Sequence, residues 1–561
     1  MKTPKDVPLD GPEINPSHLL SKSIVITLFC LSLCIAIPST DRAYDLPQMT
    51  ALLALGFFLW TRQFAKQFDK QTGLTCLAVA GVGAFVANSL EIKEILVLPI
   101  LFAAMLILFA TLTARERTLI SWGIVSVAAI QVALVLISYT LGSLDQLGLH
   151  QLNSVPVGSV GNPDFLATII AAGIFLLLQT QASKHFKFSM LVFLFVGLSL
   201  TKSRGTIALV FLLIAWEWIP KWATLSTGAV LISAIGIFWE KFAGRIQLWW
   251  VSIIAFLERP LSGHGLESFD SVYFNTNLSL MSENESFRST FGPWSSQVTD
   301  AHTLILQYAV ELGFIGAAAA AIFIGTIVFA SKSREPAYTR IILMLAAKCL
   351  YTVVLISVQS VSLLTLSLSG GTAEKSRRTV DPKFMALSLF LLLIVSSSIL
   401  QAALNSRDIY KSMNYLTIGL PERARIHLDN ILKRNPEHTD ALIAKSYSYL
   451  QQGQCSHSSL YAIQATRLRQ NMDTYKRAGH ILFECEFYRE AVELLNLLHI
   501  VFPEHRTTTM KLAWSHYYLG EYPEAKKLAQ NVLFIKPRRV SFSDERNLEE
   551  AKELIETLDR H

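Results

Sequence analysis

Hydrophobic residues in this chain gather in blocks of about 15 to 25 residues, which short polar stretches separate. A helix needs roughly 20 residues to cross the hydrocarbon core of a membrane, and it satisfies its own backbone polar groups there. The composition agrees, because 52% of the 561 residues are hydrophobic and only 16% are charged. The blocks therefore predict an all-α chain that crosses a membrane many times.

We expect a polytopic helix bundle of about 12 spans over residues 23–404, ten of them before Lys332. The first ten blocks lie at about 23–38, 47–61, 74–90, 95–113, 118–141, 165–180, 188–201, 206–219, 222–239 and 309–331. The first block lacks the small residues of a signal cleavage site, so we interpret it as an uncleaved helix after a polar tail at 1–22.

Lys and Arg collect in the loops after even-numbered spans, for example at Arg62, Arg115 and Lys332. Positive charge marks the cytoplasmic side of a membrane protein. The N-terminal tail should therefore be cytoplasmic, and the long loops at 142–163 and 240–308 should lie outside. The formal net charge of +6 reports orientation in this arrangement and indicates no nucleic-acid partner.

The stretch 341–371 has two interpretations, because polar residues from Gln359 to Ser362 interrupt it and basic residues from Lys375 to Lys383 follow it. One long tilted span would leave the basic loop outside. A span with a short returning helix, broken at the polar residues, keeps that loop inside. The charge rule favours the second interpretation, in which the last block at 384–404 carries the C-terminal region to the periplasm.

A 34-residue period marks the polar C-terminal region, residues 405–561. The matching pairs are Gly479 with Ala513, Tyr488 with Tyr522, Ala491 with Ala525, and Pro503 with Pro537. This is the tetratricopeptide spacing, in which small residues let paired helices approach and proline ends the second helix. An earlier copy keeps Ala424 and Pro436, and the copy near 441–470 is degenerate. We predict three or four repeats in an α-solenoid that docks a protein partner.

The six cysteines form no CxxC pair, and only Cys455 and Cys485 lie outside the apolar blocks. No cluster of histidines or carboxylates accompanies them. The spacing predicts neither a disulfide framework nor a metal site, and we expect no cofactor.

Four polar clusters lie at the predicted outer surface of the bundle. They are Gly161-Asn162-Pro163-Asp164, Thr201-Lys202-Ser203-Arg204-Gly205, Arg245 to Trp249 with Pro260 to Gly265, and Ala301-His302-Thr303 with Glu311 and Gly313. Polar residues gathered on the outer side of an apolar bundle indicate a site that works on that side of the membrane.

In order and spacing these clusters resemble the O-antigen ligase family, which includes lipopolysaccharide ligases, Wzy-type polymerases and pilin O-glycosyltransferases. The resemblance covers roughly residues 155–331, through SRG at a helix start, R-x-x-x-W before P-x-x-G-x-G, and AH before E-x-G. Thr303 departs from the pattern, because Asn commonly follows the family's His. The resemblance implies a GT-C-like enzyme of the bacterial inner membrane. It would move an assembled glycan from a polyprenyl-pyrophosphate donor by metal-independent displacement with inversion.

The residue types suit that chemistry. An arginine fork stays protonated and matches phosphate oxygens, so Arg204 and Arg245 are the expected pyrophosphate ligands and would stabilise charge on the leaving group. His302 is the expected catalytic base, because imidazole titrates near neutral pH and can take the proton of an acceptor hydroxyl. The other substrate-binding candidates are Asn162, Asp164, Lys202 and Glu311.

Plainer roles compete with these. Arginine at an outer helix end often reaches lipid headgroups, and Asn162 and Asp164 suit a helix cap. His264 stands between two glycines, so we expect it in a turn. Lys348 interrupts an apolar block and either pairs inside the bundle or extends to the interface. For Trp249 and Trp250, a membrane-interface belt is favoured over sugar stacking.

The leading hypothesis is a glycan transferase acting in the periplasm, with lipid A core, another glycan chain, or a protein Ser or Thr as acceptor. The repeats slightly favour a protein substrate or assembly. The rival is a polytopic secondary transporter with a docking domain, although internally repeated halves are not evident. A scaffold without activity is disfavoured, because Arg204, Arg245 and His302 are all present.

Overall fold

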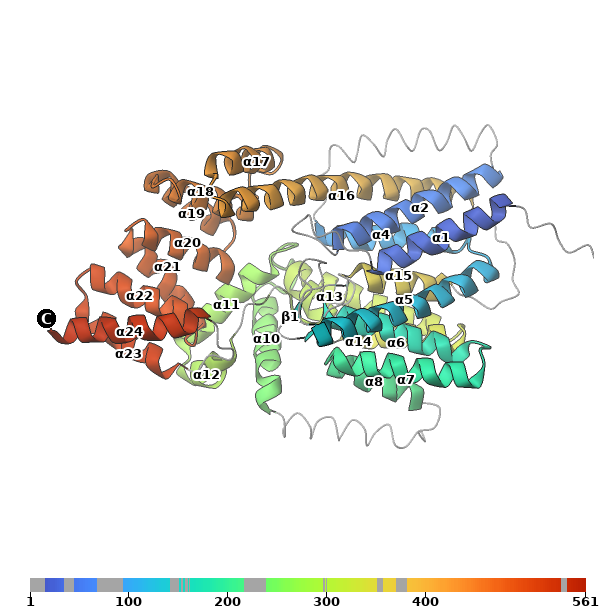
Figure 1. Ribbon diagram of the computed structural model, residues 1–561, viewed down its shortest axis with the longest axis horizontal. Helices are drawn as coiled ribbons and strands as arrows, with labels where there is room; N and C mark the ends of the chain where they lie inside the picture. The colour runs from blue at the N-terminus through green and yellow to red at the C-terminus, as the bar shows by residue number, and fades with distance from the viewer. Residues whose placement is uncertain are drawn as a thin grey trace, which may run out of the picture.

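A computed structural model describes residues 16–34, 45–67, 94–141, 151–152, 155–156, 160, 162–215, 239–295, 298, 300–350, 357–369, 381–535 and 542–560 (Figure 1). Its elements are α1 (Pro16–Cys34), α2 (Asp45–Gln67), α4 (Glu94–Phe109), α5 (Ala114–Leu141), β1 (Gln151–Leu152), β2 (Val155–Pro156), α6 (Pro163–Gln179), α7 (Lys184–Leu200), α8 (Arg204–Ala215), α10 (Trp239–Glu258), α11 (Phe269–Glu283), α12 (Glu285–Phe291), η2 (Gly292–Trp294), α13 (Leu304–Ser331), α14 (Pro336–Lys348), α15 (Val358–Ser369), α16 (Pro382–Thr417), α17 (Pro421–Arg434), α18 (Thr439–Leu450), α19 (Cys455–Leu468), α20 (Met472–Glu484), α21 (Tyr488–Val501), α22 (Arg506–Tyr518), α23 (Tyr522–Phe534) and α24 (Phe542–Arg560). The described residues are thus helical apart from one small antiparallel pair, in which Gln151 faces Pro156.

The helices before residue 216 and those from α13 to α16 share one continuous apolar core. Among the described residues, three helices are long and apolar enough to cross a membrane: α5 over Ala114–Ser138, α13, and α16. Five shorter apolar segments lie at Leu20–Leu33, Val97–Phe109, Pro163–Gln179, Arg204–Ala215 and Val358–Ser369. The expectation of about 12 full spans is therefore not supported. The expected blocks 74–90 and 222–239 lie outside the described residues.

Helix α6 shows why composition alone overcounts spans. It has 17 residues, and every residue from Leu166 to Leu177 is buried inside the protein. A helix that is hydrophobic on all sides is equally typical of a large protein's core and of a membrane span. The apolar block that forms α6 is therefore surrounded by other helices, with no requirement to reach across a bilayer.

The polar residues near Gln359 do not break the chain, so the predicted break there is wrong. They lie inside α15 and are buried. Gln359 donates a hydrogen bond to Gln48 of α2, and Ser362 Oγ lies 3.2 Å from Ser32 Oγ of α1. Polar partners from neighbouring helices satisfy these side chains, which makes their burial tolerable. The stretch nevertheless forms two helices, because α14 ends at Lys348, ahead of the described start of α15.

Helix α16 joins the bundle to the C-terminal solenoid without interruption. It runs for 36 residues, or ~54 Å at 1.5 Å per residue, from the bundle core into the first helix pair. The predicted domain boundary at 404/405 therefore lies inside a helix. Its final turns pack on α17, and the pairs α18–α19, α20–α21 and α22–α23 follow, with α24 last (Figure 1). Four tetratricopeptide-like helix pairs make up the solenoid.

The degenerate copy near 441–470 folds as an ordinary helix pair, α18 and α19. Ser446 and Ser458 are fully buried where the next two copies carry Gly or Ala. Ser446 Oγ donates to the Ser458 carbonyl at 2.6 Å, and Ser458 Oγ donates to the Ser446 carbonyl at 2.9 Å. Serine is small enough for close helix approach, and the reciprocal bonds satisfy both hydroxyls.

A disulfide links Cys455 to Cys485, with their Cα atoms 5.3 Å apart. The cysteine spacing predicted no disulfide framework, and this disulfide corrects that expectation. The two cysteines are 30 residues apart in sequence. They meet because Cys455 begins α19 and Cys485 follows α20, and stacking of successive repeats brings these positions together.

The segment between α8 and α13 connects the bundle to the solenoid. Helix α10 runs across the direction of the bundle helices, and α11 lies against the solenoid (Figure 1). Phe274 of α11 joins the solenoid core, with its ring centroid 5.3 Å from that of Tyr475 and 6.5 Å from that of Phe502. The 240–308 segment and the repeats thus share a packed interface, which places both on the same end of the bundle.

Candidate functional site

The two glycine motifs of the 240–308 segment and of α13 interlock through their backbones. The His264 and Gly265 amides donate to the carbonyls of Val310 and Glu311, both at 2.9 Å, and the Phe314 amide donates to the Pro260 carbonyl at 2.7 Å. Helix α13 is kinked at Gly313, whose φ of 68° and ψ of −154° are not helical. The three bonds are made at this kink. We call this contact, between Pro260–Gly265 and Val310–Phe314, the clasp.

The clasp leaves no room for side chains at Gly263 and Gly313. A Cβ atom on Gly263 would lie 2.4 Å from the Glu311 carbonyl carbon and oxygen, and one on Gly313 would lie 2.5 Å from the Leu261 carbonyl oxygen. His264 sits in this turn, with its Nε2 2.8 Å from the Ala255 carbonyl. The E-x-G and P-x-x-G-x-G patterns are therefore explained by backbone packing, and His264 is a turn residue.

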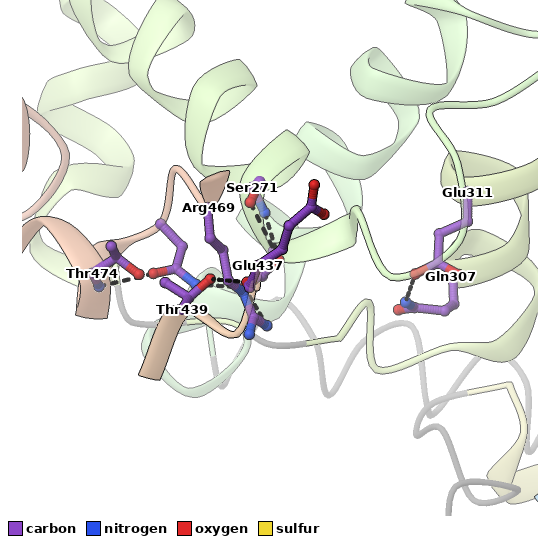
Figure 2. Close-up of polar contacts among 9 residues, drawn as sticks. Ser271, Gln307, Glu311, Glu437, Thr439, Arg469 and Thr474 are labelled. Carbon is purple, nitrogen blue, oxygen red and sulfur yellow. Dashed lines mark hydrogen bonds and ion pairs between the residues drawn. The ribbon is translucent and has the colours of Figure 1, made fainter. Parts of the chain in front are cut away.

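Glu311 positions the turn that carries His302. Its Oε1 accepts a hydrogen bond from Gln307 Nε2 at 2.7 Å, and Gln307 Oε1 accepts one from the Ala301 amide at 2.8 Å (Figure 2). Glu311 is 1% exposed. Glu311 thus supports the His302 turn through Gln307, and its predicted substrate-binding role stays a prediction.

His302 is exposed immediately before α13, with a left-handed φ of 50°. Its Nδ1 lies 2.9 Å from Asp300 Oδ1. Asp300 Oδ1 also accepts the His302 backbone amide at 2.9 Å, so the carboxylate fixes the position of this residue, and a carboxylate beside the ring is an arrangement that suits a general base. Thr303 is the N-cap residue of α13 but makes no capping hydrogen bond with its side chain.

Lys348 lies at the centre of a buried polar cluster. It is 0% exposed, and its Nζ donates to the Asp164 carbonyl at 3.0 Å, to Thr168 Oγ1 at 2.6 Å and to Thr206 Oγ1 at 3.0 Å. These three acceptors match the three donors of an ammonium group. Lys348 therefore pairs inside the bundle and ties α14 to the beginnings of α6 and α8.

The first two polar clusters meet at this lysine. Ser203 Oγ donates to Asp164 Oδ1, and Ser203 and Thr206 hydroxyls lie 2.9 Å apart. Asn162 caps α6 by accepting the Asp164 amide at 2.8 Å. Asn162 and Asp164 thus have structural partners, as the capping interpretation predicts.

Arg204 begins α8 directly above this cluster, and its side chain is exposed. Lys202, also exposed, precedes it with a left-handed φ of 54°. Two buried contacts fix the turn: the Ser203 hydroxyl donates a hydrogen bond to Asp164, and the Thr206 hydroxyl accepts one from Lys348. A fixed turn therefore presents two exposed cations.

One backbone bond joins this cluster to the start of the His302 helix. The Leu304 amide donates to the Cys349 carbonyl at 2.9 Å, directly after Lys348. Arg245 stands apart: it is exposed on α10, and no interaction with Arg204 or His302 occurs among the described residues. The structure thus brings the 162–164 and 201–204 clusters and the His302 turn into one neighbourhood, and places Arg245 on a helix that packs against α13.

The residues around Arg245 give α10 two apolar faces. Leu248, Val251 and Ala255 are buried, whereas Trp250, Ile253 and Leu257 are 52%, 40% and 60% exposed. An exposed apolar stripe beside a cation is typical of a helix that lies in a membrane interface. Trp250 therefore fits the interfacial belt.

The sequence pointed to Lys348 as a paired group, because a lysine inside an apolar block is uncommon, and it included Ser203 in the SRG pattern. It did not indicate that Thr168 and Thr206 would be the partners of Lys348, since threonine is ordinary in buried helices.

Comparisons with known proteins leave the family open. No family model matches the chain, and no curated protein matches it. Similar solved structures include the MamA RS-1 ArsTM double mutant (14% identity, TM-score 0.23, covering 28% of this chain and 98% of that one) and MamA 41-end from Desulfovibrio magneticus RS-1 (14%, 0.23, 28% and 94%). A third is the APC/C hetero-tetramer Cut9-Hcn1 (12%, 0.24, 80% and 84%). None of these supports the resemblance to the O-antigen ligase family, and the likenesses are too low to assign a fold.

Proposed function

We propose that the protein is a membrane glycosyltransferase that moves a glycan from a polyprenyl-pyrophosphate carrier to an acceptor hydroxyl outside the membrane. The observation that carries this proposal is the neighbourhood of Arg204 and His302. A cationic turn fixed from below by Lys348 is tied through Cys349 and Leu304 to the helix that His302 precedes. An exposed arginine fork suits the pyrophosphate, and a histidine oriented by Asp300 suits the acceptor proton.

The roles follow from charge. Arg204, with Lys202 beside it, binds the pyrophosphate and stabilises the charge that grows as the glycosidic bond to phosphate breaks. His302 takes the proton from the attacking hydroxyl, and the oxygen forms the new bond at the anomeric carbon. Arg245 on the interfacial helix α10 binds the same phosphates at the membrane surface. This scheme assigns no role to a metal ion or another cofactor.

The purified full-length protein tests the proposal directly. Incubated with polyprenyl-pyrophosphate-linked oligosaccharide and each of three acceptors, lipid A core, free glycan or a Ser/Thr peptide, it should transfer the oligosaccharide to one of them. Mass spectrometry of the acceptor provides the measurement. Donor that stays intact with all three acceptors would contradict glycan transfer.

The repeats are proposed to lie in the periplasm, on the face of the predicted outer loop 240–308. Two observations support this. The solenoid packs on α11 of that loop, with the Arg469 guanidinium 2.8 Å from Asp270 Oδ2. The solenoid also contains the Cys455–Cys485 disulfide, and such bonds persist in oxidising compartments such as the periplasm.

A reporter fusion decides the side of the membrane. Alkaline phosphatase fused after His561 should be active, because it folds only where its own disulfides form. A green fluorescent protein fused at the same position should stay dark. Fluorescence from the second fusion with no phosphatase activity from the first would place the repeats in the cytoplasm.

A further inference from the structure

A cleft of about 120 Å³ lies where α11 meets the solenoid. Its walls come from α11, from Val298 in the chain before His302, and from the repeat turns around Thr439 and Asn471. Figure 2 shows Thr439, Arg469 and Thr474 of the solenoid gathered beside Ser271 of α11. The cleft exists only when the two parts are packed together, so it belongs to the junction and to neither part alone.

An ion pair between the buried Asp270 and the half-exposed Arg469 fixes this junction. Asp270 is 6% exposed, and its Oδ2 accepts from Arg469 at 2.8 Å and from Asn471 Nδ2 at 2.6 Å. Asn275 of α11 adds a bond to Gln470 at 2.9 Å. Asp270 Oδ1 accepts the Ser271 amide at 2.8 Å, so both carboxylate oxygens have partners and the carboxylate holds the walls in place.

One hydroxyl in the cleft has no partner. Tyr273 lines it and is 4% exposed, yet its hydroxyl makes no hydrogen bond to any described residue. Burial raises the pKa of Tyr273, so the hydroxyl stays neutral and both donates and accepts. The tyrosine is 4% exposed and lines the cleft, so its hydroxyl can reach only a molecule that enters the cleft. A neutral phenol donates and accepts one hydrogen bond each, which suits a ligand with a hydroxyl group.

The remaining lining is half apolar and half polar. Phe274, Phe502 and Val298 form an apolar wall, while Arg469 and Asp440, with side chains 46% and 57% exposed, offer donors and acceptors at the rim. A sugar ring has this same division, with C–H groups on its face and hydroxyls at its edge that both donate and accept. The cleft volume of about 120 Å³ is several times the roughly 10–15 Å³ that admits one water, so the cleft has room for a group larger than water.

We propose that this junction cleft binds one sugar residue of the glycan that the protein transfers. The inference rests on the proposed function and adds to it a second, non-catalytic glycan contact. Val298 is four positions before His302 along the chain, so a glycan held here stays on the face where transfer occurs. The cleft would retain a long glycan between its carrier and the acceptor.

The test measures binding to the full-length protein in nanodiscs by saturation-transfer NMR. The probe is the lipid-free oligosaccharide released by mild acid from the host's lipid-linked pool. It should bind the wild type, and Tyr273→Phe should weaken binding about three- to tenfold, as expected for one lost hydrogen bond. Tyr518→Phe, which changes an exposed tyrosine of the solenoid outside the cleft, should bind as the wild type does.

Each outcome is decisive. Thermal melting of Tyr273→Phe should match the wild type, because only the unpaired hydroxyl is removed. Equal oligosaccharide affinity of Tyr273→Phe and wild type would overturn the proposal. So would exclusive binding of a Ser/Thr-rich peptide, which would make the cleft an acceptor-protein site. If transfer in the purified assay persists while the oligosaccharide fails to bind the cleft, only this inference is lost; if transfer itself is absent, the proposed function is lost.

Discussion

Replacing Arg204 by alanine should reduce glycan transfer on the order of 10²–10³-fold, the loss typical of removing one donor to a developing anion. The side chain is exposed above the Lys348 cluster, so its removal deletes no packing. Membrane abundance should therefore stay near the wild-type level, as measured by immunoblot beside glycan transfer in cells. Arg204→Lys should also be severely impaired, since an ammonium group lacks the bidentate fork.

Lys184→Ala is the matched control. Lys184 is an exposed cation at the first position of α7, and Arg204 is an exposed cation at the first position of α8, at the other end of that helical hairpin. If Arg204 only reached lipid headgroups, both alanine variants would behave alike. Wild-type transfer by Arg204→Ala would remove this residue from the mechanism.

Gly313→Ala should destabilise the protein by about 3 kcal/mol, because its φ of 68° and ψ of −154° lie in a region that only glycine occupies readily. The added Cβ would also approach the Leu261 carbonyl oxygen to 2.5 Å. The clasp should then open, and the turn that holds His302 through Gln307 and Glu311 should lose its order. Thermal melting in detergent should show a lower midpoint, and transfer should fall with it.

Gly325→Ala provides the comparison within the same helix. Nothing lies within 4 Å of the position of its Cβ, and its backbone is helical. Alanine is favoured over glycine in a helix interior by up to about 1 kcal/mol, so this variant should melt at or above the wild-type temperature. Equal melting of the two variants would show that the clasp tolerates a side chain and that the E-x-G pattern has another cause.

Several features were predictable because their signals are local. The helical class, the start of α6 at Pro163 after a capping Asn162, and the repeat spacing all follow from short patterns of apolar, capping and small residues. The turn at His264 followed from its two glycines. The repeat near 441–470 was difficult to recognise in the sequence, because Ser446 and Ser458 replace the expected Gly and Ala.

Other features were predicted incorrectly because an apolar block can form either a membrane span or a helix buried in the protein core. The buried residues of α6 look the same in sequence as a membrane span, and Gln359 looks like a break until its partner Gln48 is known. For the site, the sequence identified Arg204 and His302 as candidates by residue type, but it did not predict that Glu311 supports the His302 turn. That role depends on Gln307, which bonds to both Glu311 and the Ala301 amide.

The sequence by itself determined where helices form, where they end and which positions must be small, because these depend on neighbours within a few residues. Tertiary structure alone decided which polar groups meet. Lys348 finds the Asp164 carbonyl 184 positions away, and Asp270 finds Arg469 at a separation of 199. Such contacts arise when packing brings distant helices together and each buried donor must find an acceptor. No local pattern contains that pairing, so the lysine cluster, the disulfide and the junction cleft became visible only in the folded chain.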